Sequence, residues 1–396
     1  MFAGRINEID EFEKGLHQTK NGNPVHFLIT GERGIGKSSL MALYGHLATG
    51  SIVSPDYDKF SFATINVTIS EKTNLITFIK MIERGISRSL SGTESVRGFM
   101  KDTWEFVQRI RVMDSGIEKK DQTEDPDLVI DDFSYSLAQT VSRISNPVTG
   151  ESPKDGIVFF IDEGDNACDD LQLGYFLKIV TEKLQRSGCN SVMFIVAGLP
   201  VVVDKLLESH ESSIRVFTRQ KIRVLNPDDR HFVIDKAIEE GNKTNADKTT
   251  ITIDAKSHIS TLSDGYPHFI QQFGYSSFDH NSDGEITEDD VLEGAFKTGG
   301  AIDSIGSRYY ESQYREQIKS DEYREVLCIM AGNMNSWIKK SEIRKTFSGN
   351  DQTLSDALKA LTTRNIILKN QSKLGEYRLQ QRGFVLWIKL FGERKK

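Results

Sequence analysis

The sequence predicts an α/β protein in which a parallel sheet is followed by a helical region and then by a small domain of helices and a hairpin. Three segments, 25–30 (VHFLIT), 157–161 (IVFFI) and 191–198 (SVMFIVAG), are apolar at odd and even positions alike. This pattern is typical of strands that are covered on both faces. A segment of helical periodicity, 173–188, separates the last two. Strands that alternate with helices favour a parallel sheet.

The length and the cysteine pattern restrict the class of protein. A chain of 396 residues is expected to form two or three domains. Cys168, Cys189 and Cys328 are far apart and form no CxxC pair, which argues against a disulfide framework or a zinc site. The first residues are charged and no run of eighteen apolar residues occurs. We therefore expect a cytoplasmic protein without a membrane segment.

A phosphate-binding loop follows the first predicted strand. Residues 31–38 (GERGIGKS) match G-x-x-x-x-G-K-[ST]. The glycines allow backbone amides to wrap phosphates, and the helix that starts near Lys37 directs its positive end at them. Lys37 supplies a cation for the β- and γ-phosphates, and Ser38 supplies a hydroxyl for Mg²⁺. The predicted nucleotide-binding residues of this segment are Gly31, Gly34, Gly36, Lys37, Ser38 and Ser39.

A second motif supplies the metal anchor that such a loop requires. The apolar strand 157–161 ends at Asp162 and Glu163. Asp162 would hold Mg²⁺ through water, and Glu163 would polarise the attacking water as general base. Both motifs fall at the carboxyl ends of strands, where ligands bind in such sheets. The two motifs together predict a P-loop NTPase core that binds ATP and Mg²⁺.

With these motifs, the chain resembles AAA+ ATPases of the branch that contains origin-recognition initiators and STAND signalling ATPases. The segment 2–12 (FAGRINEIDEF) is similar to the F-x-G-R-x-x-E box of that family, and IDEGDNA (161–167) is similar to its Walker B form. The resemblance places Phe2, Gly4, Arg5 and Glu8 near the adenine. It also implies a C-terminal winged helix.

The same resemblance suggests how neighbouring subunits complete the site. The segment 214–229 is similar to the family's R-V-x-S-R, so Arg219 is the candidate arginine finger and Arg215 the second choice. An arginine from the next subunit would stabilise charge on the γ-phosphate, which implies a homo-oligomer. The alternative is a surface arginine at the edge of a strand.

Two departures from the initiator pattern predict slow or regulated hydrolysis. Related ATPases place a polar sensor after the strand 191–198, where this chain has Leu199 and Pro200. Initiators carry a sensor arginine on the lid helix, whereas this chain has Gly265-Tyr266-Pro267, close to the G-x-P of STAND proteins. The resemblance makes Pro267 a nucleotide-binding candidate and favours a nucleotide-gated switch.

Residues 279–290 (DHNSDGEITEDD) have the spacing of a calcium-binding EF-hand loop. Its glycine is Gly284, but Asp290 stands where a bidentate Glu is usual, and no second hand occurs. The simpler interpretation is that Thr287 caps the following helix. A site for Ca²⁺ at 279–290 remains the alternative.

The C-terminal quarter differs from the rest in charge. Residues 301–396 carry 18 Lys and Arg against 11 Asp and Glu, a surplus of +7, whereas residues 1–300 carry −14. Helices are predicted over 320–332, 336–349 and 352–365, followed by a hairpin over 365–381. Three helices and a hairpin form a winged helix-turn-helix, whose third helix would enter the major groove of DNA. The DNA-binding candidates are Gln352, Ser355, Lys359, Arg364, Lys373 and Arg378, with Lys369 also on the wing.

The predicted organisation is an AAA+ P-loop ATPase core (1–225), a helical lid (226–300) and a winged helix-turn-helix domain (301–396). Within the core, residues 85–155 are predicted to form two helices with a solvated connection. The first functional hypothesis is an ATP-dependent DNA-binding switch that oligomerises, as in replication initiation, transposition targeting or phage defence. The second is a STAND-type regulator whose winged helix docks a protein effector.

Overall fold

The computed structural model describes residues 3–90, 94–107, 125–147, 152–333, 336–364, 366–370 and 373–392. The chain divides into two compact units. Residues 5–223 form the first, called here the core unit, and residues 224–396 with the first four residues form the second, called the C-terminal unit. Among the described residues, no helix combines the length and the apolar character that a membrane crossing requires.

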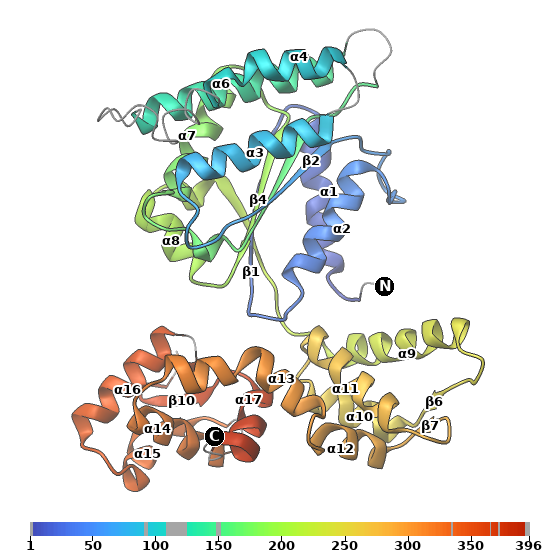
Figure 1. Ribbon diagram of the computed structural model, residues 1–396, viewed down its shortest axis with the longest axis vertical. Coiled ribbons are helices and arrows are strands. Elements are labelled where there is room, and N and C mark those ends of the chain that lie inside the picture. Colours follow the sequence, from blue (N-terminus) through green and yellow to red (C-terminus); the bar gives the residue numbers. More distant parts are fainter. Residues whose placement is uncertain are drawn as a thin grey trace. The chain divides into compact units, whose positions relative to one another are not determined.

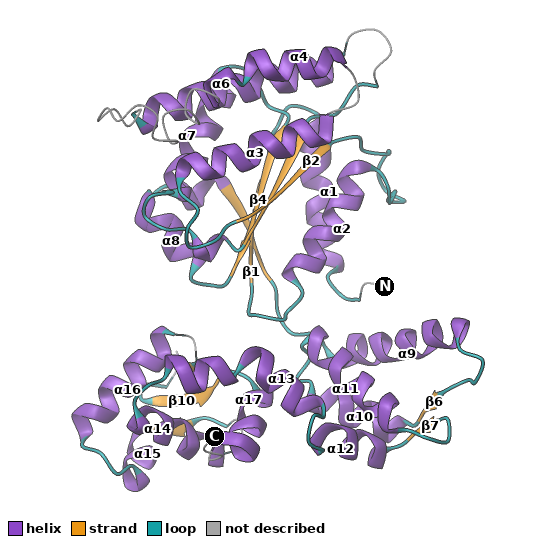
Figure 2. Cartoon of the chain, viewed as in Figure 1, coloured by secondary structure: helices purple, strands orange, loops and turns teal. Residues whose placement is uncertain are grey.

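A five-stranded sheet lies at the centre of the core unit, and its strands run parallel in the order β2-β3-β4-β1-β5 (Figure 2). The predicted parallel sheet is therefore confirmed. The strands β3 and β4 are buried along almost their whole length, because helices cover both faces. The strands are β1 (His26–Thr30), β2 (Ala63–Thr68), β3 (Ile157–Asp162), β4 (Val192–Gly198) and β5 (Phe217–Lys221).

The helices of the core unit lie on both sides of this sheet (Figure 1). On one side are α1 (Ile6–Lys20) and α2 (Lys37–Thr49). On the other side, one apolar cluster joins the strands to the remaining helices. These are α3 (Leu75–Leu90), α4 (Glu94–Thr103), α6 (Pro126–Ser145), α7 (Leu173–Arg186) and α8 (Val202–Ser209), with the short 3-10 turns η1 (Gly164–Asn166) and η2 (Ser213–Val216).

The described helices of the segment 85–155 contribute to this apolar cluster. Trp104 is buried, and its indole nitrogen donates a hydrogen bond to Thr140 Oγ1 of α6 at 3.0 Å. Phe133 of α6 contacts Phe176 of α7 with ring centroids 5.1 Å apart. The polar stretch between the predicted helices, at 108–124, lies outside the described residues.

The first part of the C-terminal unit is helical. Its helices are α9 (Pro227–Thr244), α10 (Ile253–Leu262), α11 (Pro267–His280), α12 (Glu288–Phe296) and α13 (Ala301–Tyr309). Two short strands, β6 (Thr250–Ile251) and β7 (Glu285–Ile286), pair in parallel. A π-helical turn, η3 (Gln313–Gln317), leads to the last part of the chain.

The last part of the described chain combines four α-helices with a small antiparallel sheet of order β8-β10-β9. Its elements are α14 (Asp321–Gly332), β8 (Ile338–Lys339), α15 (Lys340–Thr346), α16 (Asp351–Thr363), β9 (Ile367–Lys369), β10 (Glu376–Leu379), α17 (Arg382–Trp387) and the π-helical turn η4 (Ile388–Gly392). The first three of these helices and the β9–β10 hairpin follow one another in the predicted order, whereas β8 was not predicted, and α17 and η4 follow the hairpin. Asn365, Gln371 and Ser372 of the predicted hairpin lie outside the described residues.

The prediction of one helix over 336–349 is wrong. Ile338 and Lys339 form strand β8, which pairs with β10, and the helix covers only Lys340–Thr346. The backbone N–H of Lys340 donates to the Gly375 carbonyl at 2.8 Å, so the turn of the hairpin holds the start of the helix. A strand of two residues carries too little periodicity to be recognised in a sequence.

Candidate nucleotide-binding site

The loop that follows β1 is built to expose backbone amides. Gly34 and Gly36 have φ angles of 77° and 100°, in the left-handed region that glycine adopts without strain. Gly36 caps α2 without any side-chain hydrogen bond. The first N–H groups of α2 therefore lack a side-chain cap and, as at any helix start, intrahelical partners. The end of a helix with free amides is a favourable place for a phosphate.

The Lys37 side chain is folded into this loop. Its ammonium donates to the carbonyls of Gly31 at 2.9 Å and Glu32 at 3.1 Å. Burial lowers the pKa of Lys37, and the carboxylates of Asp165, Glu163 and Asp162 act in the opposite direction. Gly31 has no room for a side chain, because a Cβ atom there would lie 2.9 Å from the Ile35 side chain and 3.2 Å from the Ile222 carbonyl.

Two segments far apart in the sequence meet at the next residue of α2. The hydroxyl of Ser38 donates to Asp162 Oδ2 at 2.8 Å, and Asp162 Oδ1 accepts from the Glu163 N–H at 2.8 Å. A hydroxyl and a carboxylate are oxygen ligands of the kind that Mg²⁺ prefers. In the described part of the chain, no three His, Cys, Asp or Glu side chains gather as metal ligands. A Mg²⁺ ion at Ser38 and Asp162 would therefore need water and phosphate oxygens to complete its coordination.

Glu163 has an unusual backbone and an unusual pKa. It adopts φ 56°, which is rare for a residue with a side chain. Desolvation raises the pKa of its carboxyl group, and the carboxylates of Asp165 and Asp162 raise it further. A carboxylate with a raised pKa is a stronger base, which suits a group that must attract a proton from water.

Asp165 is a residue of this site to which the sequence assigned no role. Its Oδ1 atom accepts the N–H of Leu199 at 2.8 Å, immediately after β4. A Cβ atom on Gly198 would lie 2.7 Å from that oxygen, so glycine is needed there. The carboxylate of Asp165, in the turn η1, thus lies at the end of β4, where the sequence itself has no polar side chain. The only signal in the sequence was its place in the segment IDEGDNA (161–167), which is similar to the Walker B form.

The other predicted nucleotide residues are placed as follows. Ser39 is exposed on α2. Arg5 precedes α1 with φ 68°, and its guanidinium donates to the Arg223 carbonyl. The Glu8 carbonyl accepts from the Tyr44 hydroxyl at 2.7 Å. Phe2 lies outside the described residues, and Gly4 belongs to the C-terminal unit, as does Pro267, the first residue of α11.

The arginine-finger candidates lie at one edge of the sheet. Arg219 is an exposed residue within β5, opposite Leu28 of β1. Arg215 is exposed in the 3-10 turn that leads into β5. Because β5 is the last strand of the sheet, both arginines are placed where another molecule could reach them.

The calcium-like loop is organised by a helix cap. The Thr287 hydroxyl accepts from the Asp290 N–H at 3.4 Å, and Asp290 Oδ2 accepts the N–H of Thr287 at 2.8 Å, which forms a capping box. Asn281 donates its amide to Asp283 Oδ1 at 2.9 Å and to the Glu285 carbonyl at 3.0 Å. Asp290 and Asn281 are therefore engaged within the protein, as the simpler interpretation requires.

The DNA-binding candidates lie on α16 and the hairpin. Gln352, Lys359 and Arg364 are exposed, and so is Lys373. Ser355 is half-buried and accepts from Lys340 Nζ at 2.8 Å. Several of the side chains are held by neighbours: Gln352 donates to Asp356 at 3.1 Å, Arg364 donates to the Gln317 carbonyl at 3.1 Å, and the Arg378 guanidinium lies 5.2 Å from the Trp337 ring centroid.

No family model and no curated protein matches the sequence. Solved structures do match. A Walker-type ATPase of Pyrococcus abyssi is similar over 98% of this chain and 96% of its own, with 15% identity and a TM-score of 0.58. The Aeropyrum pernix ORC2 protein in ADPNP–ADP complexes is similar over 98% of this chain and 92% of its own, with 14% identity and a TM-score of 0.59.

The chain has the fold of an ORC-like P-loop ATPase. The ADP form of the Aeropyrum ORC2 protein is also similar, with 13% identity and a TM-score of 0.51. At these identities the likeness concerns the fold, and function has to be argued from the residues of the site. In this ORC-like fold, Lys37, Ser38, Asp162 and Glu163 come together at the carboxyl ends of β1 and β3.

Proposed function

We propose that the chain is an ATPase that binds ATP and Mg²⁺ at residues 31–38. The observation that carries this proposal is the hydrogen bond of 2.8 Å between Ser38 and Asp162, which joins the phosphate loop to the acidic strand end. In this proposal the amides of the loop and Lys37 bind the phosphates. Ser38 and Asp162 hold the metal, which supplies charge neutralisation at the phosphates when it is bound.

Glu163 is the proposed general base. Its raised pKa and its position beside Asp162 support this role. Arg219 on the edge strand is the proposed finger for a neighbouring subunit, so the active form would be a homo-oligomer. Arg5 and Pro267 are proposed to contact the nucleotide, and hydrolysis is proposed to be slow or regulated, since the end of β4 offers Asp165 paired to an amide in place of a free polar sensor.

We further propose that the nucleotide state controls DNA binding by the C-terminal helices and hairpin. The surplus of +7 in residues 301–396 and the exposed positions of Gln352 and Lys359 on α16, and of Arg364 directly after it, support this. The alternative is a regulator whose winged helix docks a protein effector. Gly265, with φ 77°, and Pro267 at the start of α11 favour it, because they match the G-x-P pattern.

Nucleotide binding and turnover test the first part. We expect Lys37→Ala to weaken binding of a fluorescent ATP analogue at least about tenfold, because charge-assisted contacts to phosphate are lost. Glu163→Gln should retain binding and reduce turnover by about 10²-fold or more. Lys14→Ala, at an exposed lysine of α1, is the matched control. Unchanged affinity in Lys37→Ala would show that the loop is not the site.

DNA binding tests the second part. An electrophoretic mobility assay with ATP, ADP and a slowly hydrolysed analogue, combined with sizing of the complexes, measures both affinity and assembly. The DNA switch predicts affinity that depends on the nucleotide and falls steeply with salt. An ATP-dependent assembly that ignores DNA would favour the protein-effector alternative.

A further inference from the structure

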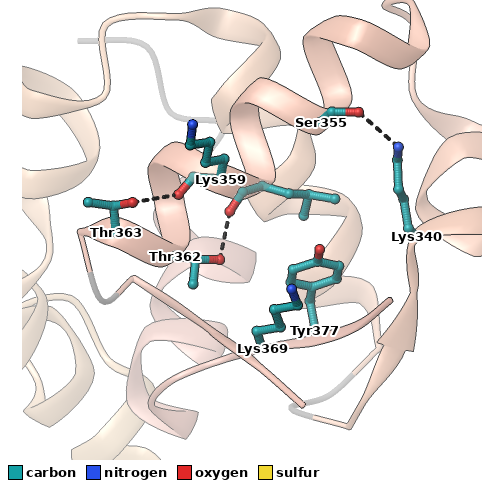
Figure 3. Close-up of a pocket in the computed structure, with 8 residues that line it drawn as sticks. Lys340, Ser355, Lys359, Thr362, Thr363, Lys369 and Tyr377 are labelled. Atoms are coloured by element: carbon teal, nitrogen blue, oxygen red, sulfur yellow. Dashed lines mark hydrogen bonds between the residues drawn. The ribbon is translucent and has the colours of Figure 1, made fainter. Parts of the chain in front are cut away.

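A pocket of about 290 Å³ opens between α16 and the hairpin strands of the C-terminal unit. Lys340, at the start of α15, lines it together with Lys359 of α16 and Lys369 of β9. Figure 3 shows these side chains around the opening, with Tyr377 of β10 beside Lys369. The backbone register agrees, because Tyr377 and Lys369 are directly opposite in the β9–β10 pair. Three elements therefore contribute lysines to one small space.

The lining of this pocket is positively charged. It contains three lysines and no carboxylate. Lys340 is partly neutralised, since its ammonium donates to Asp351 Oδ2 at 3.2 Å and to Ser355 Oγ at 2.8 Å. An ammonium has three donors, so one remains for a ligand. Within the described part of the chain, Lys359 and Lys369 have no ion-pair partner.

Of the neutral groups that line the pocket, the threonine hydroxyls are already used as donors within α16 and the tyrosine hydroxyl is available to a ligand. The hydroxyls of Thr362 and Thr363 donate to backbone carbonyls of α16, at 2.6 Å to Leu358 and 3.0 Å to Lys359 (Figure 3). Their protons are thus used within the helix. The Tyr377 hydroxyl makes no hydrogen bond to other described residues, so it is a fourth donor. A site with cationic and hydroxyl donors around a small space suits a tetrahedral oxyanion.

We propose that this pocket holds one phosphate of a DNA backbone, with Lys359 and Lys369 as its main contacts and Lys340 and Tyr377 as additional donors. The proposal rests on the DNA binding proposed above and extends it, because Lys340 and Tyr377 were not expected at DNA from the sequence. A phosphate contact fixes the position of the protein on the duplex and reads no bases. The pocket would therefore set how α16 approaches the groove, independently of sequence.

The test is the salt dependence of duplex binding by the full chain. Fluorescence anisotropy with a labelled duplex would compare the wild type with the double variant Lys359→Gln, Lys369→Gln. We expect about tenfold weaker binding, equal for unrelated duplex sequences, and a slope of log affinity against log salt that is smaller by about one. Tyr377→Phe should weaken binding by a smaller factor, because one hydroxyl donor is lost.

A second double variant removes the same charge elsewhere. Lys14→Gln with Lys319→Gln changes two exposed lysines that do not line the pocket. Equal thermal unfolding of the two double variants shows that folding is intact. If both double variants bind DNA with the same affinity and slope, the pocket proposal is overturned while DNA binding stands.

Failure of the DNA proposal itself has a different signature. In that case the wild type binds no duplex at any salt concentration, and the proposal that DNA supplies the phosphate is overturned. NMR titration of the full chain with inorganic phosphate then identifies the source. Shifts at Tyr377 in the wild type, absent from the Lys359→Gln, Lys369→Gln variant, would assign the pocket to a free phosphate.

Discussion

The two compact units organise their candidate sites differently. The core unit contains parallel strands of five to seven residues, and its site is built at their ends from loop amides and side chains next to buried strands. The described strands of the C-terminal unit have two to four residues, and its candidate surface consists of side chains on the outer face of a half-buried helix and on a short hairpin. Long buried strands fix the relative positions of the residues at their ends. Where the strands are short, side-chain contacts decide the positions of the site residues.

Substitution of Gly156, which precedes β3, tests how strongly the backbone of the core unit is restricted at the start of that strand. Gly156 has φ +143°, and a Cβ atom there would lie 2.0 Å from the Ser191 carbonyl oxygen, which accepts the first N–H of β3. We expect Gly156→Ala to lower the free energy of unfolding by about 3 kcal/mol in urea titrations, because strain and a displaced strand add together. Gly188→Ala, with φ +75° and no atom within 4 Å, should cost only about 1 kcal/mol. Equal losses of unfolding free energy in Gly156→Ala and Gly188→Ala would show that the backbone is not specially restricted at the start of β3.

His26 gives the core a dependence on pH. It is buried in β1, its Nδ1 accepts the Phe194 N–H at 3.1 Å, and burial lowers its pKa to about 4 from 6.5. Between these two values the unfolded chain binds more protons than the folded one, so stability is lost as pH falls from about 6.5 to about 4. We expect a loss of up to about 3 kcal/mol, measured by urea unfolding at pH 7 and pH 4.5.

The variant His26→Gln isolates that effect. It should flatten the pH dependence of the wild type over this range, since the titrating group is gone. His17→Gln, at an exposed histidine of α1, is the control and should keep the wild-type dependence. A His26→Gln profile parallel to that of the wild type would contradict the assignment.

The capping box at α12 tests the C-terminal unit with a smaller effect. Thr287→Ala removes the side chain that accepts the Asp290 N–H, so we expect a loss of about 1 kcal/mol in the unfolding of that unit. Nucleotide affinity should stay unchanged, because the phosphate loop belongs to the core unit. Thr244→Ala, at the exposed end of α9, is the control and should cost a few tenths of that amount. A large loss of ATP binding in Thr287→Ala would show that this helix cap also supports the nucleotide site, which contradicts the separate roles expected of the two units.

The smallest expected effect is that of Ca²⁺. Asp290 Oδ2 accepts two hydrogen bonds from Thr287, each at 2.8 Å, and these compete with coordination of an ion. Isothermal titration with millimolar Ca²⁺ should therefore release no heat of binding. Saturable heat that disappears in Asp290→Ala would reinstate the loop as a calcium site.

Part of the candidate site could be predicted because chemistry restricts its residue types. The loop 31–38 needs glycines, a lysine and a hydroxyl, and the structure joins its Ser38 to Asp162 as the two motifs suggested. The contact between Asp165 and the Leu199 amide was not predicted, because it depends on β3 and β4 being neighbours. The sequence did not show that Arg219 lies within a strand, since an edge strand with polar residues has a weak apolar signal.

The sequence by itself determined the doubly covered parallel strands, the phosphate loop with its acidic partner, and the order of helices and hairpin in the last quarter. These features are local, because apolar runs and fixed spacings involve residues that lie close together in the sequence. Only the tertiary structure decided that β8 joins the hairpin, that Asp165 reaches the end of β4, and that three lysines meet in one pocket. Such contacts depend on which distant segments become neighbours, and local patterns do not contain that information.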